Sequence, residues 1–248
     1  MRIALLIEYN GQRFYGWQAQ ANLRTAQGEL QTALSKVAQA PITVFCAGRT
    51  DRGVHATGQV VHFDTTAIRP LYGWVLGANT YLDRDLVIIK STLVKDTFHA
   101  RFSAIARSYR YVIANQPRRS AIHDGLVTWV HQPLDAELMH QGAQFLMGTH
   151  DFTALRATGC QAQTPIRTIH TINVHRVGTQ VIMDVTANAF LHHMVRNIIG
   201  VLIKIGTGEQ PIDWVTQVLL SKNRACAGIT APPDGLCLSH ITYKEPLF

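Results

Sequence analysis

The stretch Arg2-Ile3-Ala4-Leu5-Leu6-Ile7-Glu8-Tyr9 decides the fold, because it predicts a β-strand that is apolar on both faces. Such a strand belongs in the middle of a sheet that is covered on both sides. Residues 11–24 follow it and contain Gly11, Gly16 and several polar groups, which predicts a loop. Residues 26–39 then predict a helix, with one apolar face formed by Leu30, Ala33, Leu34 and Val37.

The next segments complete the order strand, helix, strand, strand, helix, strand. Their predicted bounds are 42–47 and 58–64 for two strands, 70–81 for a helix and 86–95 for a strand. The second half of the chain repeats this order. It has predicted strands at 104–114, 167–177, 180–188 and 236–243, and predicted helices at 135–146, 190–206 and 211–221. Gly178-Thr179 predicts a tight hairpin turn between two of these strands.

This repetition predicts an α+β fold made of two similar split-βαβ, or ferredoxin-like, halves. The halves are expected at residues 1–100 and 101–248. We expect them to share a mostly antiparallel sheet and to leave a cleft between them, since ligands commonly bind in such clefts.

The composition favours a soluble protein with a polyanionic partner. The formal net charge is +7, and binding of basic side chains to phosphates releases counterions. No segment is long and apolar enough to span a bilayer, and the N-terminal stretch from Met1 to Glu8 has a charge too early for a signal peptide. The four cysteines form no CxxC pair, which disfavours zinc and a disulfide framework. We therefore expect a protein of the reducing cytoplasm.

The segment Ala47-Gly48-Arg49-Thr50-Asp51-Arg52-Gly53-Val54-His55-Ala56 lies between two predicted strands and gathers four ionisable residues in seven positions. Charged loops between apolar strands are where catalytic groups concentrate. Asp51 is the candidate catalytic residue. The spacing alone also fits a solvated turn in which Asp51 caps a backbone N–H group.

The part of this segment from Gly48 to Ala56 resembles the signature of the tRNA pseudouridine synthase A family. Other segments resemble family blocks and keep the family's order: Phe14-Tyr15-Gly16-Trp17-Gln18-Ala19-Gln20, Phe98-His99-Ala100-Arg101, Arg107-Ser108-Tyr109-Arg110-Tyr111, His150-Asp151-Phe152, Phe190-Leu191-His192-His193-Met194-Val195-Arg196-Asn197 and Ala231-Pro232-Pro233-Asp234-Gly235-Leu236. Two positions depart from the family pattern. Asp83 stands where proline is usual, and Cys237 stands where an aromatic residue is frequent.

The resemblance implies an isomerase that converts uridine to pseudouridine in tRNA, on the 3′ side of the anticodon stem-loop at positions 38–40, and that works as a homodimer. The reaction gains no atoms, so no cofactor is expected. In agreement, the sequence has neither a GxGxxG motif after a strand nor a phosphate-binding GxxxxGK[ST] motif. Asp51 would act as the nucleophile at C1′ or as the base that removes the 2′ proton.

The resemblance also implies three substrate-binding residues. Tyr109 would stack on the target base, although a strand position that it shares with Tyr111 also fits a buried structural tyrosine. Arg196 would pair with Asp51, although its place on the polar side of a helix also fits a solvated face. Arg49 would contact a flanking phosphate or help displace the base.

The remaining polar residues suggest weaker hypotheses. No metal is expected, because His192 and His193 belong to no HExxH pattern, and His55, His99 and His150 are expected to bond backbone or RNA. Basic candidates for phosphate contact are Arg24, Arg118, Arg119, Lys204, Lys222 and Arg224. Two other functions stay open: a catalytically silent RNA-binding protein on the same scaffold, and a hydrolase that would use Asp151 as a second carboxylate.

Overall fold

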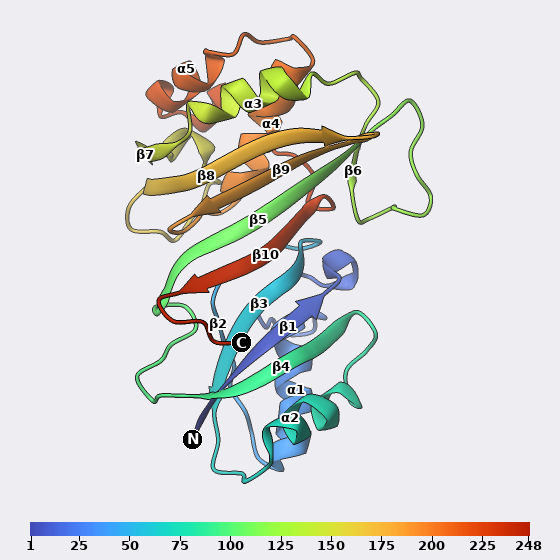
Figure 1. Cartoon of the computed structure of the whole chain (residues 1–248), viewed down its shortest axis with the longest axis vertical. Coiled ribbons are helices and arrows are strands. Elements are labelled where there is room, and N and C mark those ends of the chain that lie inside the picture. The colour runs from blue at the N-terminus through green and yellow to red at the C-terminus, as the bar shows by residue number, and fades with distance from the viewer. The chain divides into compact units, whose positions relative to one another are not determined.

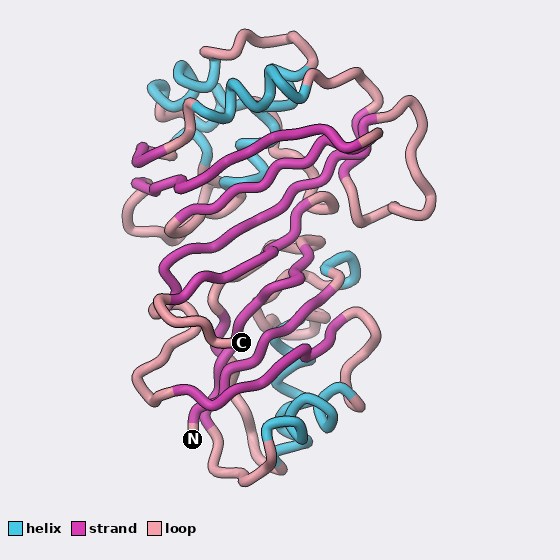
Figure 2. The backbone as a smooth tube through the Cα atoms, in the orientation of Figure 1, coloured by secondary structure: helices cyan, strands magenta, loops and turns pink.

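The computed structural model describes all 248 residues, which form two compact units. The first unit comprises residues 1–107 and 237–248, and the second comprises residues 108–236. Each unit combines helices with a mostly antiparallel sheet, so the predicted α+β class is confirmed (Figures 1 and 2). No helix is both long enough and apolar enough to cross a membrane.

The first unit has the strand and helix order that the sequence predicts. It contains β1 (Arg2–Tyr9), α1 (Ala26–Ala38), β2 (Phe45–Cys46), β3 (His55–Asp64), α2 (Leu71–Asn79) and β4 (Leu86–Val94), with a short 3-10 helix at Gly11–Arg13. Strand β1 lies between β4 and β3, and β2 pairs with β3, all antiparallel. This is the order of a split-βαβ unit. Helices α1 and α2 pack against each other beside the sheet (Figure 1).

The apolar pattern of the first strand explains its central place. The side chains of Ile3, Leu5 and Ile7 are fully buried, and so is Ala4, which points to the opposite face. Helix α1 begins where Thr25 accepts a hydrogen bond from the Gly28 N–H group at 3.3 Å. The strand prediction at 2–9 and the helix prediction at 26–39 are therefore confirmed to within a residue.

The strand predicted at 42–47 is only two residues long in the structure. Side chains of α1 take up the backbone groups that a longer strand would use. The Ile42 N–H donates to Ser35 Oγ, and the Val44 N–H donates to Gln31 Oε1, at 2.9 and 3.0 Å. Residues 42–44 therefore bind to the helix instead of extending the sheet ladder.

The second unit contains β5 (Ala104–Asn115), which starts in the first unit, β6 (Thr128–Val130), α3 (Ala136–Gln144), β7 (Gly148–Asp151), β8 (Ile166–Val177), β9 (Gln180–Ala187), α4 (Met194–Gly206) and α5 (Trp214–Ser221). Two 3-10 helices span Thr153–Leu155 and Arg224–Ala227. The strands follow the order β5-β9-β8-β7, and β6 pairs with β5. The hairpin of β8 and β9 turns at Gly178, as predicted. Strands β6 and β7 were not predicted.

Helix α4 begins at Met194, four residues later than the predicted start at residue 190. The cause lies in the backbone, because His193 has a left-handed conformation with φ of 60°. A turn closes before the helix, where the Met194 N–H donates to Leu191 O at 3.0 Å. Helix α5 likewise begins at Trp214, after Pro211, so the predicted start at residue 211 was three residues early.

The division of the chain differs from the expected halves of 1–100 and 101–248. Strand β10 (Leu236–Tyr243) pairs in parallel with β3, where Cys237 faces His55 and Leu238 faces Ala56. The Tyr243 hydroxyl then donates to Ala100 O at 2.8 Å. These bonds place the end of the chain in the first unit. A pattern of local periodicity does not reveal this, because pairing partners about 180 residues apart leave no local signal.

Candidate active site

The Asp51 loop, residues 47–56, connects β2 to β3 in the first unit. Its turn is closed by the backbone, since the Val54 N–H donates to Asp51 O at 3.1 Å. The N-terminal loop, residues 11–24, forms backbone hydrogen bonds to the Asp51 loop. The Trp17 N–H donates to Thr50 O at 3.0 Å, and the Gly53 N–H donates to Phe14 O at 3.4 Å. The peptide groups on both sides of Asp51 are therefore fixed by another segment.

Gly16 makes this contact between loops possible. Its φ is +89°, a conformation that strongly favours glycine. A Cβ atom at this position would lie 3.0 Å from Thr50 O and 3.3 Å from the Asp51 carbonyl carbon. Phe14 and Trp17 are buried on either side and pack around the Tyr9 ring. The N-terminal loop and the Asp51 loop, which both resemble family blocks, thus pack against each other.

Hydrogen bonds with buried polar groups also stabilise the Asp51 loop. The hydroxyl groups of Tyr9 and Thr50 lie 2.8 Å apart, and both residues are buried. Gln59 Nε2 donates to Gly48 O at 2.6 Å. His55 Nδ1 accepts from the Gly11 N–H at 3.0 Å, so His55 bonds backbone as expected. Preorganised support of this kind holds a reactive group in position without a cost at the moment of reaction.

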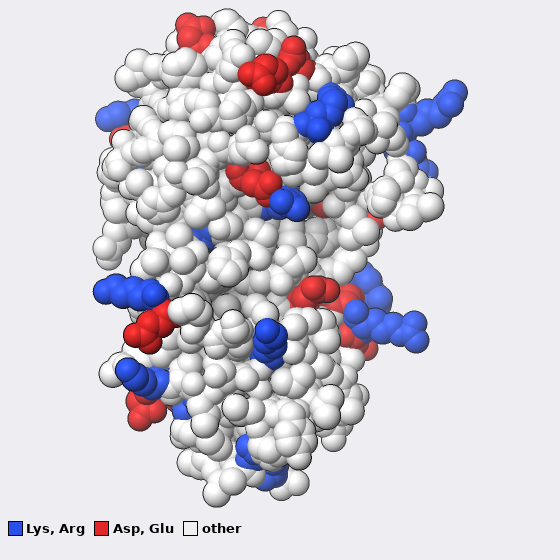
Figure 3. Space-filling model, viewed as in Figure 1, with Lys and Arg blue, Asp and Glu red and all other residues white.

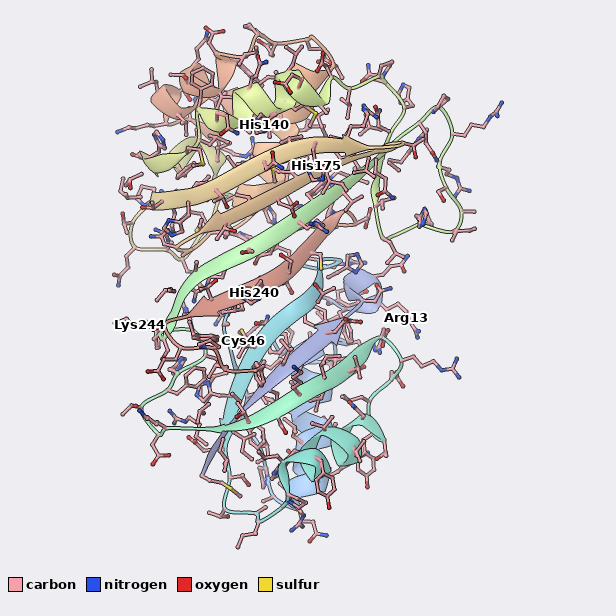
Figure 4. The ribbon with its side chains drawn as sticks, in the orientation of Figure 1. Arg13, Cys46, His140, His175, His240 and Lys244 are labelled. Atoms are coloured by element: carbon pink, nitrogen blue, oxygen red, sulfur yellow. The ribbon has the colours of Figure 1, made fainter.

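The ionisable side chains of the loop have different surroundings. Asp51 is half-buried, whereas Arg49 and Arg52 are both exposed. The Arg52 guanidinium lies 4.3 Å from the centre of the Tyr15 ring, which is a cation–π contact. Cys46, labelled in Figure 4, is the nearest thiol in sequence, and burial raises its pKa to about 12. That thiol therefore stays protonated at neutral pH.

In the second unit, the structure separates the roles of two tyrosines on one face of β5. Tyr111 is completely buried, and its hydroxyl donates to Pro232 O at 2.8 Å and lies 2.6 Å from Thr128 Oγ1. Burial raises the pKa of Tyr111 above its ordinary value. Tyr109 keeps 9% exposure and meets Phe190 edge to face, with ring centres 5.1 Å apart. Tyr111 is therefore structural, and Tyr109 remains the candidate for base stacking.

Arg196 lies in the first turn of α4 and does not belong to a solvated face. It is half-buried, and its Nε donates to Ala231 O at 2.8 Å. The Ala231 N–H donates back to Arg196 O at 3.2 Å. Its neighbour Asn197 is fully buried. The segment around residue 231, another family-like block, thus anchors Arg196.

Most basic candidates for phosphate contact are engaged within the protein. Arg24 forms ion pairs with Glu29, Asp83 and Asp85, and its contacts with Asp85 and Glu29 raise its pKa. Arg224 donates to Gly228 O, Asn197 Oδ1 and Thr230 Oγ1. Lys204 lies 5.9 Å from the Trp214 ring centre. Arg118 and Arg119 are exposed, and on the face in Figure 3 acidic and basic groups occur in small mixed groups.

Asp151, the second carboxylate that a hydrolase would need, is held by structural bonds. It accepts from the Thr153 N–H and hydroxyl at 2.9 and 2.6 Å, and it pairs with Lys222 at 3.3 Å. The Thr153 hydrogen bond is the main cause that lowers the pKa of Asp151. These contacts explain the residue as a turn former.

The histidines form local contacts, and so do Asp83 and Cys237, the two residues that depart from the family pattern. His99 Nδ1 accepts from the Arg101 N–H, and His150 Nε2 lies 2.7 Å from Met147 O. His140 on α3, labelled in Figure 4, accepts from the Val174 N–H on β8. Asp83 binds Arg24, and Cys237 Sγ contacts Thr57 Oγ1 at 3.7 Å.

A family model and two similar proteins agree with one another. A family model described as tRNA pseudouridine synthase matches residues 5–103 and 143–244. The tRNA pseudouridine synthase A of Haemophilus influenzae is 53% identical over 245 residues, with 99% of this chain and 91% of that protein covered. Its counterpart from Shewanella amazonensis is 54% identical, with 99% and 94% covered. A chain of the crystal structure of a Cbf5-Nop10-Gar1 complex aligns with a TM-score of 0.33 at 10% identity, covering 82% of this chain and 54% of that one.

Proposed function

The chain belongs to the tRNA pseudouridine synthase family, and from this premise we propose that Asp51 catalyses the isomerisation of uridine to pseudouridine in tRNA. In this reaction the C1′–N1 glycosidic bond breaks, the uracil turns, and C5 bonds to C1′. The C5 proton is then lost, and N1 regains a proton. The enzyme is an isomerase, and its reaction balances without any redox partner.

The observation that carries this proposal is the fixed Asp51 loop. Backbone bonds from Trp17 and to Phe14 hold the peptide groups around Asp51, while the side chain stays partly accessible. A carboxylate in such a place suits attack on C1′ as a nucleophile. It equally suits removal of the 2′ proton after the sugar cation forms. Both routes need an ionised and oriented Asp51.

Three further residues have proposed roles by resemblance to the family. Tyr109, which keeps some exposure, stacks on the target base, and stacking contributes about 1–3 kcal/mol per base. Arg196, held through Ala231, supplies a positive charge that orients the catalytic carboxylate. Arg49, which is accessible to solvent, contacts a phosphate beside the target nucleotide.

The substrate site and the assembly are proposed on the same grounds. We propose that the enzyme acts on uridines at positions 38–40 of the anticodon stem-loop, as a homodimer in the cytoplasm. The target base must leave the stack to reach a carboxylate, because C1′ is inaccessible within a helix.

Release of tritium from tRNA labelled at uridine C5 tests the activity. We expect the wild type to release tritium and Asp51→Asn to release none, while Asp51→Asn still binds tRNA. This variant keeps the size of the side chain and removes only its charge. No release by the wild type would support a silent RNA-binding protein. Release that Asp51→Asn leaves unchanged would exclude Asp51 as the catalyst, and free uracil as product would indicate a hydrolase.

A further inference from the structure

Asn197 is a fully buried polar residue in the first turn of α4, immediately after Arg196. Its amide is satisfied by protein groups on both sides. Nδ2 donates to Leu155 O at 2.8 Å, and Oδ1 accepts from the Thr230 hydroxyl at 2.7 Å and from Arg224 at 3.0 Å. A buried amide is tolerated only with such partners, and its bonds then fix one arrangement of the surrounding segments.

Arg224 belongs to the same hydrogen-bond network. Its guanidinium donates to Thr230 Oγ1 at 2.7 Å and to Gly228 O at 2.6 Å, in addition to Asn197. The Thr230 hydroxyl therefore bridges Arg224 and Asn197, accepting from one and donating to the other. These bonds restrain the irregular segment 228–230.

The segment 228–230 packs directly against α4. A Cβ atom on Gly200 would lie 2.0 Å from Ile229 O, so helix and segment approach as closely as glycine allows. The next residue, Ala231, is buried and binds Arg196 twice, through its N–H to Arg196 O and through its carbonyl to Arg196 Nε. The position of Ala231 O thus sets the direction of the guanidinium.

We propose that Asn197, Arg224 and Thr230 are positioning residues that aim the Arg196 guanidinium through Ala231. The inference rests on the proposed role of Arg196 in the reaction. An arginine side chain has several rotatable bonds, and a fixed guanidinium is more effective than a mobile one because little freedom remains to be lost in the transition state. The network therefore acts on kcat and leaves tRNA binding almost unchanged.

The Thr230 hydroxyl allows a sharp test, because Thr230→Val removes it at nearly constant shape and Thr230→Ser keeps it. We expect Thr230→Val to lower kcat for tritium release by about tenfold, with KM for tRNA changed less than about twofold. Thr230→Ser should stay near the wild type. Thr216→Val, at another half-buried threonine of this unit, is the matched control and should have no effect.

A double-mutant cycle separates positioning from general stabilisation. In an Arg196→Lys background, followed by single-turnover release, Thr230→Val should cause almost no further loss. A full, additive loss in that background would overturn the inference, and so would equal rates for Thr230→Val and Thr230→Ser. If Thr230→Val does not fold, as judged by thermal unfolding, Arg224→Lys takes its place in the same cycle. If Arg196→Lys keeps the wild-type rate, the proposed role of Arg196 fails, whereas an inactive wild type overturns the proposed function itself.

Discussion

At the scale of single residues, Tyr109 and Tyr111 follow the same sequence pattern but have different surroundings. Both lie on the same face of β5, and periodicity alone does not separate them. The hydroxyl of Tyr111 is bonded to Thr128 and Pro232 in the interior, whereas the Tyr109 ring lies beside Phe190 and the residue keeps 9% exposure. What distinguishes them is therefore the set of partners that distant segments bring.

His62 carries a prediction at the same scale. It is buried on β3, its Nδ1 accepts from the Ala100 N–H at 3.1 Å, and its ring contacts His99. Burial is the main cause that lowers its pKa to about 4, from an ordinary value of 6.5, and the charges of His99 and Arg2 add to this. The unfolded chain thus binds a proton at a higher pH than the folded protein does.

Stability should consequently fall as the pH drops from about 6.5 to about 4, because protonation favours the unfolded chain across this window. Urea unfolding at a series of pH values measures the effect. His62→Asn keeps an acceptor near the Nδ1 position and cannot titrate, so it should flatten this part of the profile. An unchanged slope in the variant would assign the acid sensitivity to other groups.

At the scale of elements, the decisive contact is between two loops and not between helices or strands. The N-terminal loop presents Gly16 to the backbone of the Asp51 loop, and backbone bonds from Trp17 and Gly53 join the two. Each loop is irregular by itself, but together they satisfy each other's peptide groups. The Asp51 loop is thereby held by backbone hydrogen bonds to the N-terminal loop.

Gly16→Ala should disturb this contact in two ways. The positive φ costs about 1–2 kcal/mol in stability for an L-residue, and the added methyl group presses on Thr50 O. Gly208→Ala is a matched control, because its φ is +77° and nothing lies within 4 Å of the new Cβ. We expect both variants to lose stability in thermal unfolding, Gly16→Ala more than Gly208→Ala because of the added steric contact, but only Gly16→Ala to lose kcat by about tenfold or more. Equal rates for the two would show that the loop contact does not matter for catalysis.

At the scale of the whole molecule, the chain has a formal net charge of +7. Some of its basic side chains are engaged with other protein groups, and others are exposed at the surface. Arg24, Arg224 and Lys222 are engaged with protein groups. Arg118 and Arg119 lie on the loop between β5 and β6, and Arg119 is 3.9 Å from Asp124, with both side chains about two-thirds exposed. Such a weak surface pair leaves its cation able to bind phosphate.

The double variant Arg118→Gln and Arg119→Gln should therefore bind tRNA more weakly at low salt. The slope of log affinity against log salt should decrease by about one for each phosphate that is no longer neutralised. Filter binding across salt concentrations measures both quantities. Arg69→Gln with Arg84→Gln removes the same charge from exposed positions of the first unit and serves as control. If both double variants behave alike, only the net charge matters, and the β5–β6 loop does not bind tRNA specifically.

Features that depend on local periodicity and short motifs can be predicted from the amino-acid sequence alone. The apolar run of β1, the amphipathic α1, the hairpin at Gly178 and the place of Asp51 between two strands all follow from neighbouring residues. The family was recognisable for the same reason, because its blocks are short and keep their order along the chain.

Which polar residues are available to act on a substrate depends on the three-dimensional fold. It placed β10 beside β3, buried Asn197 within α4, and engaged Arg24 and Arg224 in internal bonds. The physical reason is that a hydrogen bond or an ion pair depends on a partner often tens of residues away. Local patterns record the tendency of a segment to form a helix or a strand, but they contain no information on which distant group will satisfy its polar atoms.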